Sequence, residues 1–212
     1  MARPAASGTT ILSSNRHSQF TVSPGAGLLR PAVQCPSPNQ DDRPDNDEPS
    51  LIVIHGISLP PGEFGGHYIE QFFTNCLDGG VHPYFAGICD RHVSAHLLIR
   101  RDGAVVQFVP FGRRAWHAGE SRFRGRSRCN DFSIGIELEG EDETLYEDAQ
   151  YEVLVDVLDT LIDSYAPLSI RTIAGHCDIA PRRKTDPGPA FDWLRLYDGL
   201  SHRIRARTDR TQ

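Results

Sequence analysis

FSIGIELEG, residues 132–140, is the stretch that decides the fold class. Every second residue of it is apolar, while the positions between them are small or acidic, and this alternation is typical of a β-strand. A glutamate on such a strand usually faces solvent, which would account for Glu139 and for Glu137. Gly135, however, precedes Glu137 on the same face and leaves room for a ligand. Glu137 is therefore a candidate general base.

The segments around this strand predict a mixed sheet. The run LIVIH at 51–55 is typical of a buried strand, and RTIAGH at 171–176 of a second one. Residues 93–110 form two apolar runs around Asp-Gly, which predicts a hairpin. Helical spacing occurs at 67–78, at about 147–165 and at 189–200, the last with Pro189 near its first turn. We predict an α/β (α+β) fold with a central mixed β-sheet flanked by helices.

Composition and charge narrow the class of protein. The net charge of −6 argues against a broad nucleic-acid surface, and no stretch approaches the roughly 20 apolar residues of a membrane span. The first thirty residues lack a secretory signal, and five cysteines without a CxxC pair predict a reducing, cytoplasmic compartment. Residues 1 to about 49 are rich in Ser, Pro, Gly, Asn and Asp, so we expect them to be loosely ordered.

Two histidines stand out because each ends a short apolar strand just before a loop. They are His55 and His176, and Asp186 follows in a loop held by three prolines. A single histidine at such a place is more often part of a structural hydrogen bond. Two of them with Asp186 favour a metal, because three His or Asp ligands and an open position form a catalytic zinc site. The ten-residue separation of His176 and Asp186 is by itself a weak signal.

Several further polar and aromatic residues can each be interpreted as structural or as functional. Lys184 is either a surface lysine or a group that stabilises an oxyanion on a carbonyl. Trp116 and His117 are either packing residues or a wall that binds sugar or peptide, and His96 lies either in the core or behind the same cleft. Four arginines at alternate positions from 122 to 128 form either a solvated loop or a small anion site.

Five segments of the chain are distinctive when taken together. They are LIVIHGISLPPGEFGGHYIEQFFTN (51–75), HPYFAGI (82–88), VSAHLLIRRDGAVVQFVPFGRRAWHAG (93–119), RCNDFSIGIELEG (128–140) and GHCDIAPRRKTDPGPAFDW (175–193). This combination closely resembles the AmpD branch of the zinc N-acetylmuramoyl-L-alanine amidases, and the runs RKTDPGPAFDW and DFSIGIELEG are its most specific parts. The resemblance covers about residues 28–197, which sets the expected limits of a zinc amidase domain between a poorly ordered extension (1–27) and a C-terminal tail (198–212).

This resemblance implies a role for each residue of the site. Zinc (Zn²⁺, one ion per chain) would be held by His55, His176 and Asp186. Glu137 and Lys184 match the catalytic pair of the family. Tyr84 matches a tyrosine near the zinc, and Arg128 a position associated with substrate binding. Two departures concern contacts with the substrate: Gly56 replaces the usual asparagine, and His92 stands where an arginine is common.

The expected function is hydrolysis of the lactyl-amide bond between N-acetylmuramic acid and L-alanine. The substrate class implied is a muramyl peptide, particularly the 1,6-anhydro form released in cell-wall turnover, and the enzyme is expected to be monomeric and cytoplasmic, without nucleic-acid or membrane partners. Two alternatives stay open at this point. One is a muramyl-peptide binding module without catalysis, and the other is an envelope amidase that acts on intact peptidoglycan.

Overall fold

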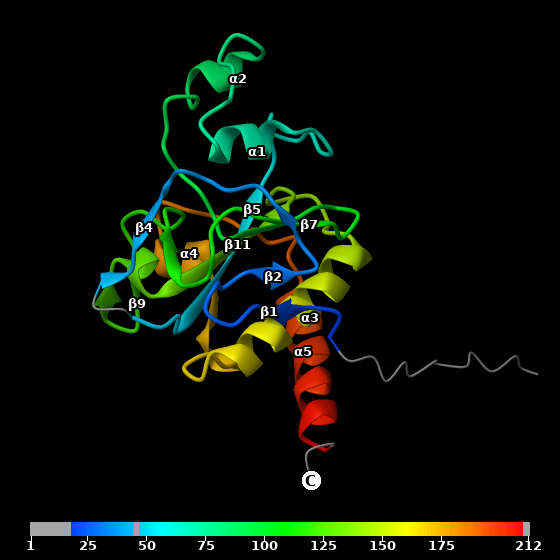
Figure 1. Ribbon diagram of the computed structural model, residues 1–212. Helices are drawn as coiled ribbons and strands as arrows, with labels where there is room; N and C mark the ends of the chain where they lie inside the picture. Colours follow the sequence, from blue (N-terminus) through cyan, green and yellow to red (C-terminus); the bar gives the residue numbers. More distant parts are fainter. Residues whose placement is uncertain (1–17, 45–46, 210–212) are drawn as a thin grey trace, which may run out of the picture.

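A six-stranded mixed sheet forms the centre of the computed structural model, which describes residues 18–44 and 47–209 (Figure 1). The strand β11 (Ser133–Glu139) lies inside it, parallel to β5 (Leu51–Ile57) on one side and to β6 (Leu97–Ile99) on the other. The predicted mixed sheet is confirmed. Its order is β12 (Ile173–Gly175), β5, β11, β6, β7 (Val105–Gln107), β3 (Val33–Gln34), with only β6 and β7 antiparallel.

All seven residues of β11 are buried, although their pattern predicts one exposed polar face. Glu137 is 8% exposed and Glu139 only 2%. The reason is that β11 has parallel neighbours on both edges, and parallel sheets are normally covered on both faces. Glu139 accepts hydrogen bonds from the backbone N–H groups of Gly65 and Arg101, so it anchors two loops. Glu137 lies in a cleft described below.

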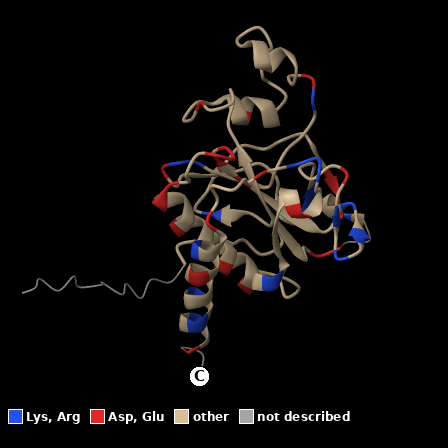
Figure 2. Cartoon of the chain, turned by 180° about the vertical axis from the view of Figure 1, so that it is seen from behind, with Lys and Arg blue, Asp and Glu red and all other residues tan. Residues whose placement is uncertain are grey.

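Two long helices cover one face of the sheet. α3 (Asp148–Ser164) begins with a capping box between Glu147 and Gln150. α5 (Trp193–Thr208) has Asp192 as its N-cap, so Pro189 lies before the helix rather than in its first turn. Basic side chains on α5 pair with acidic ones on α3, and Figure 2 shows these bands of charge along the helices. The pairs are Arg195–Asp148, Arg203–Asp156, Arg207–Asp159 and Arg207–Asp163.

The packed unit extends beyond the predicted limits of 28 and 197. Phe20 is 5% exposed and Leu200 is fully buried, and both belong to the core between the sheet and the long helices. The expectation of a loose segment up to residue 49 differs from what is found for residues 18–44, while residues 1–17 lie outside the described residues. This segment contains β1 (Thr21–Val22), β2 (Leu29–Arg30), β3 and β4 (Gln40–Asp42).

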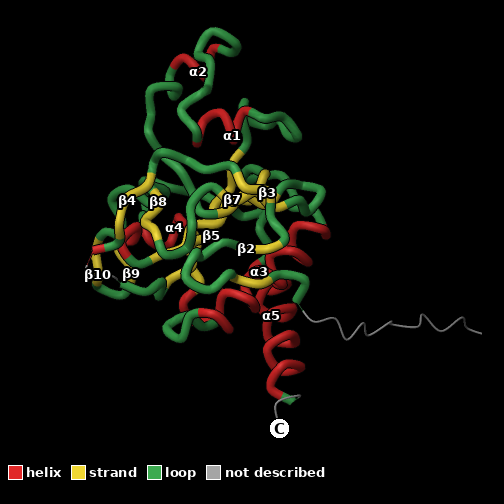
Figure 3. Tube along the Cα trace, in the orientation of Figure 1, coloured by secondary structure: helices red, strands yellow, loops and turns green. Residues whose placement is uncertain are grey.

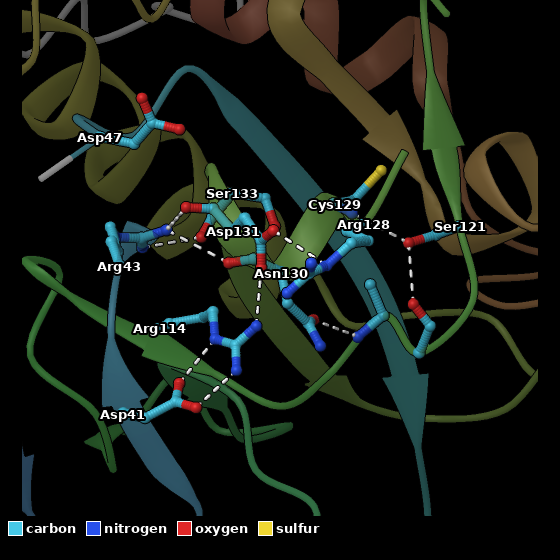
Figure 4. A network of polar contacts seen from close by, with 12 residues as sticks. Asp41, Arg43, Asp47, Arg114, Ser121, Arg128, Cys129, Asn130, Asp131 and Ser133 are labelled. Carbon is cyan, nitrogen blue, oxygen red and sulfur yellow. Dashed lines mark hydrogen bonds and ion pairs between the residues drawn. The ribbon is translucent and has the colours of Figure 1, made fainter. Parts of the chain in front are cut away.

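Arginine contacts fasten this N-terminal segment to the body of the protein (Figure 4). The guanidinium of Arg43 is buried and donates to the backbone carbonyls of Phe111, Asp131 and Ser133. Arg114 bridges Asp41 on β4 and Asp131 beside β11. Composition alone predicts loose order because it counts few apolar residues, but these ionic and backbone contacts provide the missing attachment.

The remaining elements are short and lie mostly at the edges. α1 (Tyr68–Phe73) and α2 (Pro83–Ala86) lie at the end of the molecule opposite to the free end of α5 (Figures 1 and 3). α1 is shorter than the predicted 67–78. The others are β8 (Arg113–Ala115), β9 (Arg122–Phe123), β10 (Arg126–Ser127), α4 (His176–Ile179) and the 3-10 turns η2 (Cys129–Asp131) and η3 (Ile170–Thr172). No helix in the described part combines the length and hydropathy needed to cross a membrane.

Candidate metal centre and catalytic cleft

Three predicted ligands meet at one point although they come from different elements. His55 is on β5, His176 starts α4 directly after β12, and Asp186 lies in the loop that follows. The Nδ1 atoms of His55 and His176 are 2.9 Å apart, and Asp186 Oδ2 lies 3.1 Å from the first and 3.0 Å from the second. Both histidines are 2% exposed. Each of the three side chains thus places one possible ligand atom at the same point.

This donor set fits a zinc ion. Two imidazole nitrogens and one carboxylate oxygen are ligands that zinc prefers, at about 2.0–2.2 Å, and tetrahedral geometry then places the donors roughly 3.3 Å from one another. The observed separations of 2.9 to 3.1 Å are close to that value. Two imidazole nitrogens that face each other at 2.9 Å also need a shared proton or a cation between them.

Partners on the far side of each imidazole fix its tautomer. His176 Nε2 lies 3.2 Å from the carbonyl of Ala118, so it can carry the hydrogen and leave Nδ1 free when a metal is bound. His55 Nε2 lies 2.9 Å from His117 Nδ1, and His117 Nε2 lies 3.0 Å from Ser133 Oγ. With Nδ1 of His55 free, hydrogens point from His55 to His117 and from His117 to Ser133. Such outer contacts orient ligating histidines.

The position of His117 corrects one step of the sequence analysis. A Cβ at Gly135 would lie 2.5 to 2.8 Å from the ring atoms of His117, so the space beside Glu137 on β11 holds this imidazole and not a ligand. His117 still lines the cleft, but its ring nitrogens contact His55 and Ser133. The reading as part of a wall for sugar or peptide therefore stays a prediction, with a supporting role for His55 beside it.

Burial and neighbouring charges shift the protonation of the site. Burial lowers the pKa of His55 to about 4 and so keeps the imidazole neutral at neutral pH, although a hydrogen bond to the Asp186 carboxylate opposes this shift. Burial alone would raise the pKa of Asp186, but the hydrogen bonds of His176 and His55 bring it below its usual range. His55 is thus ready to ligate and Asp186 is ionised.

Glu137 is placed beside the ligands by strand register. It is the partner of His55 in the pairing of β11 with β5. Burial raises the pKa of Glu137 well above its ordinary value, the charge of Asp186 raises it further, and Lys184 offsets part of the effect. A carboxylate with a raised pKa is a better proton acceptor than an exposed one. Lys184 is exposed and lies on the ligand loop, two residues before Asp186.

A cleft of about 660 Å³ opens over these groups. His55, His176, Asp186, Glu137 and Lys184 all line it. Its lining also includes the acidic residues 141–143, the more apolar residues Leu59, Phe72, Tyr84 and Ile88, and Arg91. The cleft therefore combines polar and apolar side chains, as small-molecule sites commonly do.

The other predicted substrate residues are spread over different places. Tyr84 lines the cleft and is 45% exposed. Arg128 lies beside Asp131 in the polar network of Figure 4. Its side chain is 72% exposed, its Nε lies 3.2 Å from Asp131 Oδ2, and it lines a second cleft of about 430 Å³. Trp116 is half-buried, and its backbone pairs with Ser94 beside the cleft. Of the four proposed substrate residues, Tyr84 and His117 line the cleft that contains the ligands, and His117 contacts the ligand His55.

Two residues of the site were missed by sequence reasoning. Ser133 carries no motif of its own, and only its place on the face of Glu137 could have indicated it. Tyr146, between β11 and α3, is buried and its hydroxyl donates to the carbonyl of Pro187 at 2.9 Å. A Cβ at Gly56 would lie 2.4 Å from that hydroxyl. The departure at Gly56 thus has a steric explanation in this chain.

Comparison with known proteins agrees with this geometry. Residues 45–189 match the family Amidase_2, described as N-acetylmuramoyl-L-alanine amidase. The 1,6-anhydro-N-acetylmuramyl-L-alanine amidase AmpD of Citrobacter freundii is 60% identical over 170 residues, which are 80% of this chain and 90% of that protein. A crystal structure of a selenomethionine AmpD derivative superposes with a TM-score of 0.81 and 58% identity, covering 82% of this chain and 97% of the other.

A more distant solved structure contains a substrate. It is the N-acetylmuramyl-L-alanine amidase AmiD of Escherichia coli in complex with anhydro-N-acetylmuramic acid-L-Ala-D-γ-Glu-L-Lys. It is 28% identical, with a TM-score of 0.52, and covers 85% of this chain and 65% of that one.

Proposed function

The chain belongs to the N-acetylmuramoyl-L-alanine amidase family, and on this premise we propose that it hydrolyses the lactyl-amide bond between N-acetylmuramic acid and L-alanine in muramyl peptides. The names of its relatives favour the 1,6-anhydro form of the sugar as substrate. One observation carries the proposal: the donor atoms of His55, His176 and Asp186 lie within 3.1 Å of one another in a cleft that Glu137 also lines.

We propose zinc as the metal of this site, held by His55, His176 and Asp186. When bound, zinc supplies a Lewis acid that activates water and polarises a carbonyl. Glu137 accepts a proton from the attacking water, because its carboxylate is buried beside the ligands with a raised pKa. The Nζ of Lys184 stabilises the oxyanion that develops on the carbonyl. Glu137 then returns the proton to the nitrogen of L-alanine as the C–N bond breaks.

We further propose that the enzyme acts as a cytoplasmic monomer in peptidoglycan recycling. All of the ligands and both catalytic residues come from one chain, so the site needs no partner subunit. The five cysteines are free thiols, as is usual in a reducing compartment. Tyr84, His117, Arg128 and Trp116 remain proposed substrate contacts, and Tyr84 and His117 have the strongest support because both line the cleft.

The direct test is mass spectrometry of the products after the zinc-loaded protein has been incubated with 1,6-anhydro-N-acetylmuramyl-tripeptide. We expect free tripeptide and anhydro-N-acetylmuramic acid, and a parallel sample treated with a chelator should release neither. An intact substrate in the presence of bound zinc would refute the amidase function for this substrate and favour the binding module. Fractionation of cells, followed by detection of the protein with an antibody, distinguishes the cytoplasmic enzyme from an envelope amidase.

A further inference from the structure

The loop that carries Lys184 and Asp186 is held in place mainly by backbone contacts. Cys177 N–H donates to the carbonyl of Asp186 at 3.0 Å, and Ala190 N–H donates to the carbonyl of Asp142 at 3.0 Å. Gly188 has φ +81° and lies so close to Asp142 that an added Cβ would approach its Cα to 2.2 Å. Between these two attachments, the carbonyl of Pro187 is held by a side chain, the hydroxyl of Tyr146.

Tyr146 reaches this carbonyl because glycines leave space for it. A Cβ at Gly140 would lie 2.4 Å from the Cε1 atom of its ring, and a Cβ at Gly56 would lie 2.4 Å from its hydroxyl oxygen. The ring is 6% exposed and packs edge-on against Phe191 at 5.5 Å between centroids. Gly56 directly follows the ligand His55, and Pro187 directly follows the ligand Asp186. The hydroxyl therefore connects the neighbours of two ligands.

We propose that Tyr146 is a positioning residue for the metal site: its hydroxyl holds the carbonyl of Pro187 and so keeps the Asp186 carboxylate within 3.1 Å of the two histidine nitrogens. Gly56 is also part of this arrangement, because a side chain at position 56 would displace the hydroxyl of Tyr146. The inference rests on the proposed zinc site. A ligand held at the right distance loses less freedom when the metal binds, which strengthens binding.

Tyr146→Phe separates positioning from packing, since the ring remains and only the hydroxyl is lost. Tyr151→Phe is the matched control. Tyr151 is equally buried, packs on the same Phe191, and its hydroxyl accepts a hydrogen bond from the backbone N–H of Asp192 at 2.6 Å, away from the ligands. Both variants leave one backbone group without its partner, so both should lower the unfolding temperature of the metal-free protein. Only Tyr146→Phe should weaken zinc binding.

The measurement is the zinc dissociation constant of the full chain, obtained by competition with a chromogenic chelator. We expect Tyr146→Phe to weaken zinc binding about tenfold, the lower end of the effect of outer contacts in metal sites, and Tyr151→Phe to leave it within about twofold of the wild type. Equal zinc affinities of Tyr146→Phe and the wild type would overturn the inference, as would an equal loss in Tyr151→Phe. A wild-type chain that binds no zinc would overturn the proposed metal as well.

A second pair of variants tests the steric half of the proposal. Gly56→Ala should weaken zinc binding more than Tyr146→Phe does, because the new methyl group pushes the whole tyrosine from its place. In the double variant Gly56→Ala/Tyr146→Phe the nearest ring atom would be Cζ at 3.7 Å, an ordinary contact. We therefore expect the double variant to bind zinc more tightly than Gly56→Ala alone. Losses that simply multiply would show that the two residues act independently and would overturn the arrangement.

Discussion

Glu137 is the residue whose change should separate catalysis from metal binding. Glu137→Gln keeps the shape of the side chain but removes the proton acceptor, so we expect kcat to fall by about 10²–10⁴ while the zinc content stays at one ion per chain. Steady-state kinetics and metal analysis of the same sample provide the two readings. Glu143→Gln, on the exposed rim of the same cleft, is the control and should remain near wild-type activity. Near-normal turnover of Glu137→Gln would rule out its role.

Ser133 is the end of the hydrogen-bond chain that orients His55. Removing its hydroxyl in Ser133→Ala leaves His117 Nε2 without an acceptor, so both imidazoles gain freedom to turn. We expect zinc affinity to fall about tenfold. Ser37→Ala serves as a control, because this buried serine donates to the carbonyl of Phe73 and touches no ligand. If both variants bind zinc like the wild type, the chain through His117 has no part in the metal site.

At the scale of residues, the sequence predicts which side chains can bind a metal better than it predicts which residues pack around them. His55, His176 and Asp186 could be proposed because their side chains have metal chemistry and their positions follow strands. The space beside Gly135 could not be assigned, because it is filled by His117, which is 18 residues away in the chain. Contacts of this kind depend on the packing of segments that no local pattern links. The same holds for Tyr146 and Gly56.

At the scale of elements, α5 gives the clearest test of a predicted boundary. Residues 198–212 were expected to form a tail, but α5 continues to Thr208 and Leu200 is fully buried against the core. Leu200→Ala should therefore lower the free energy of unfolding by about 2–5 kcal/mol, as is usual for a buried leucine. His202→Ala, at an exposed position of the same helix, should change it by less than about 0.5 kcal/mol. Urea unfolding measures both, and a Leu200→Ala protein as stable as the wild type would contradict the observed packing.

Elements with a strong local pattern were predicted closely. The hairpin around Gly103 is confirmed, with φ +84° at the glycine, and so is the long helix predicted at about 147–165, which is α3. The strands β1 to β4 were not predicted, because they are two or three residues long and carry no alternation. They are held by distant partners, such as Arg43 on the carbonyl of Ser133. Long-range attachment of this kind has no signature in composition.

At the scale of the whole molecule, the residues of the site lie on the same strands that form the core of the sheet. The sheet must bury β5 and β11 on both faces to be stable, and this buries His55 and Glu137 as well. His96 is buried behind them, and His117 is partly buried between His55 and Ser133. A cluster of neutral imidazoles in the interior makes the stability of the metal-free protein sensitive to acid, because each imidazole can take up a proton once the chain unfolds.

The direction of this pH dependence follows from the pKa values. Burial lowers the pKa of His55 to about 4, and burial together with neighbouring positive charge lowers the pKa of His96 and His117 well below 6.5. Between about pH 4 and 6.5 the unfolded chain therefore binds more protons than the folded one, so stability falls as the pH falls. Glu137 acts in the opposite direction, because burial raises its pKa and the folded chain holds its proton above pH 4.5.

Three imidazoles outweigh one carboxyl group, so we expect the metal-free protein to lose stability between pH 7 and pH 5. His55 alone should contribute a loss of about 2 kcal/mol over this range. Urea unfolding at pH 7, 6 and 5 in the presence of a chelator measures the effect. Zinc should stabilise the protein most at pH 7, since protons compete with the metal for the same nitrogens. A metal-free protein that becomes more stable from pH 7 to pH 5 would contradict this prediction. It would show that the raised pKa of Glu137 affects stability more than the lowered pKa values of the three histidines.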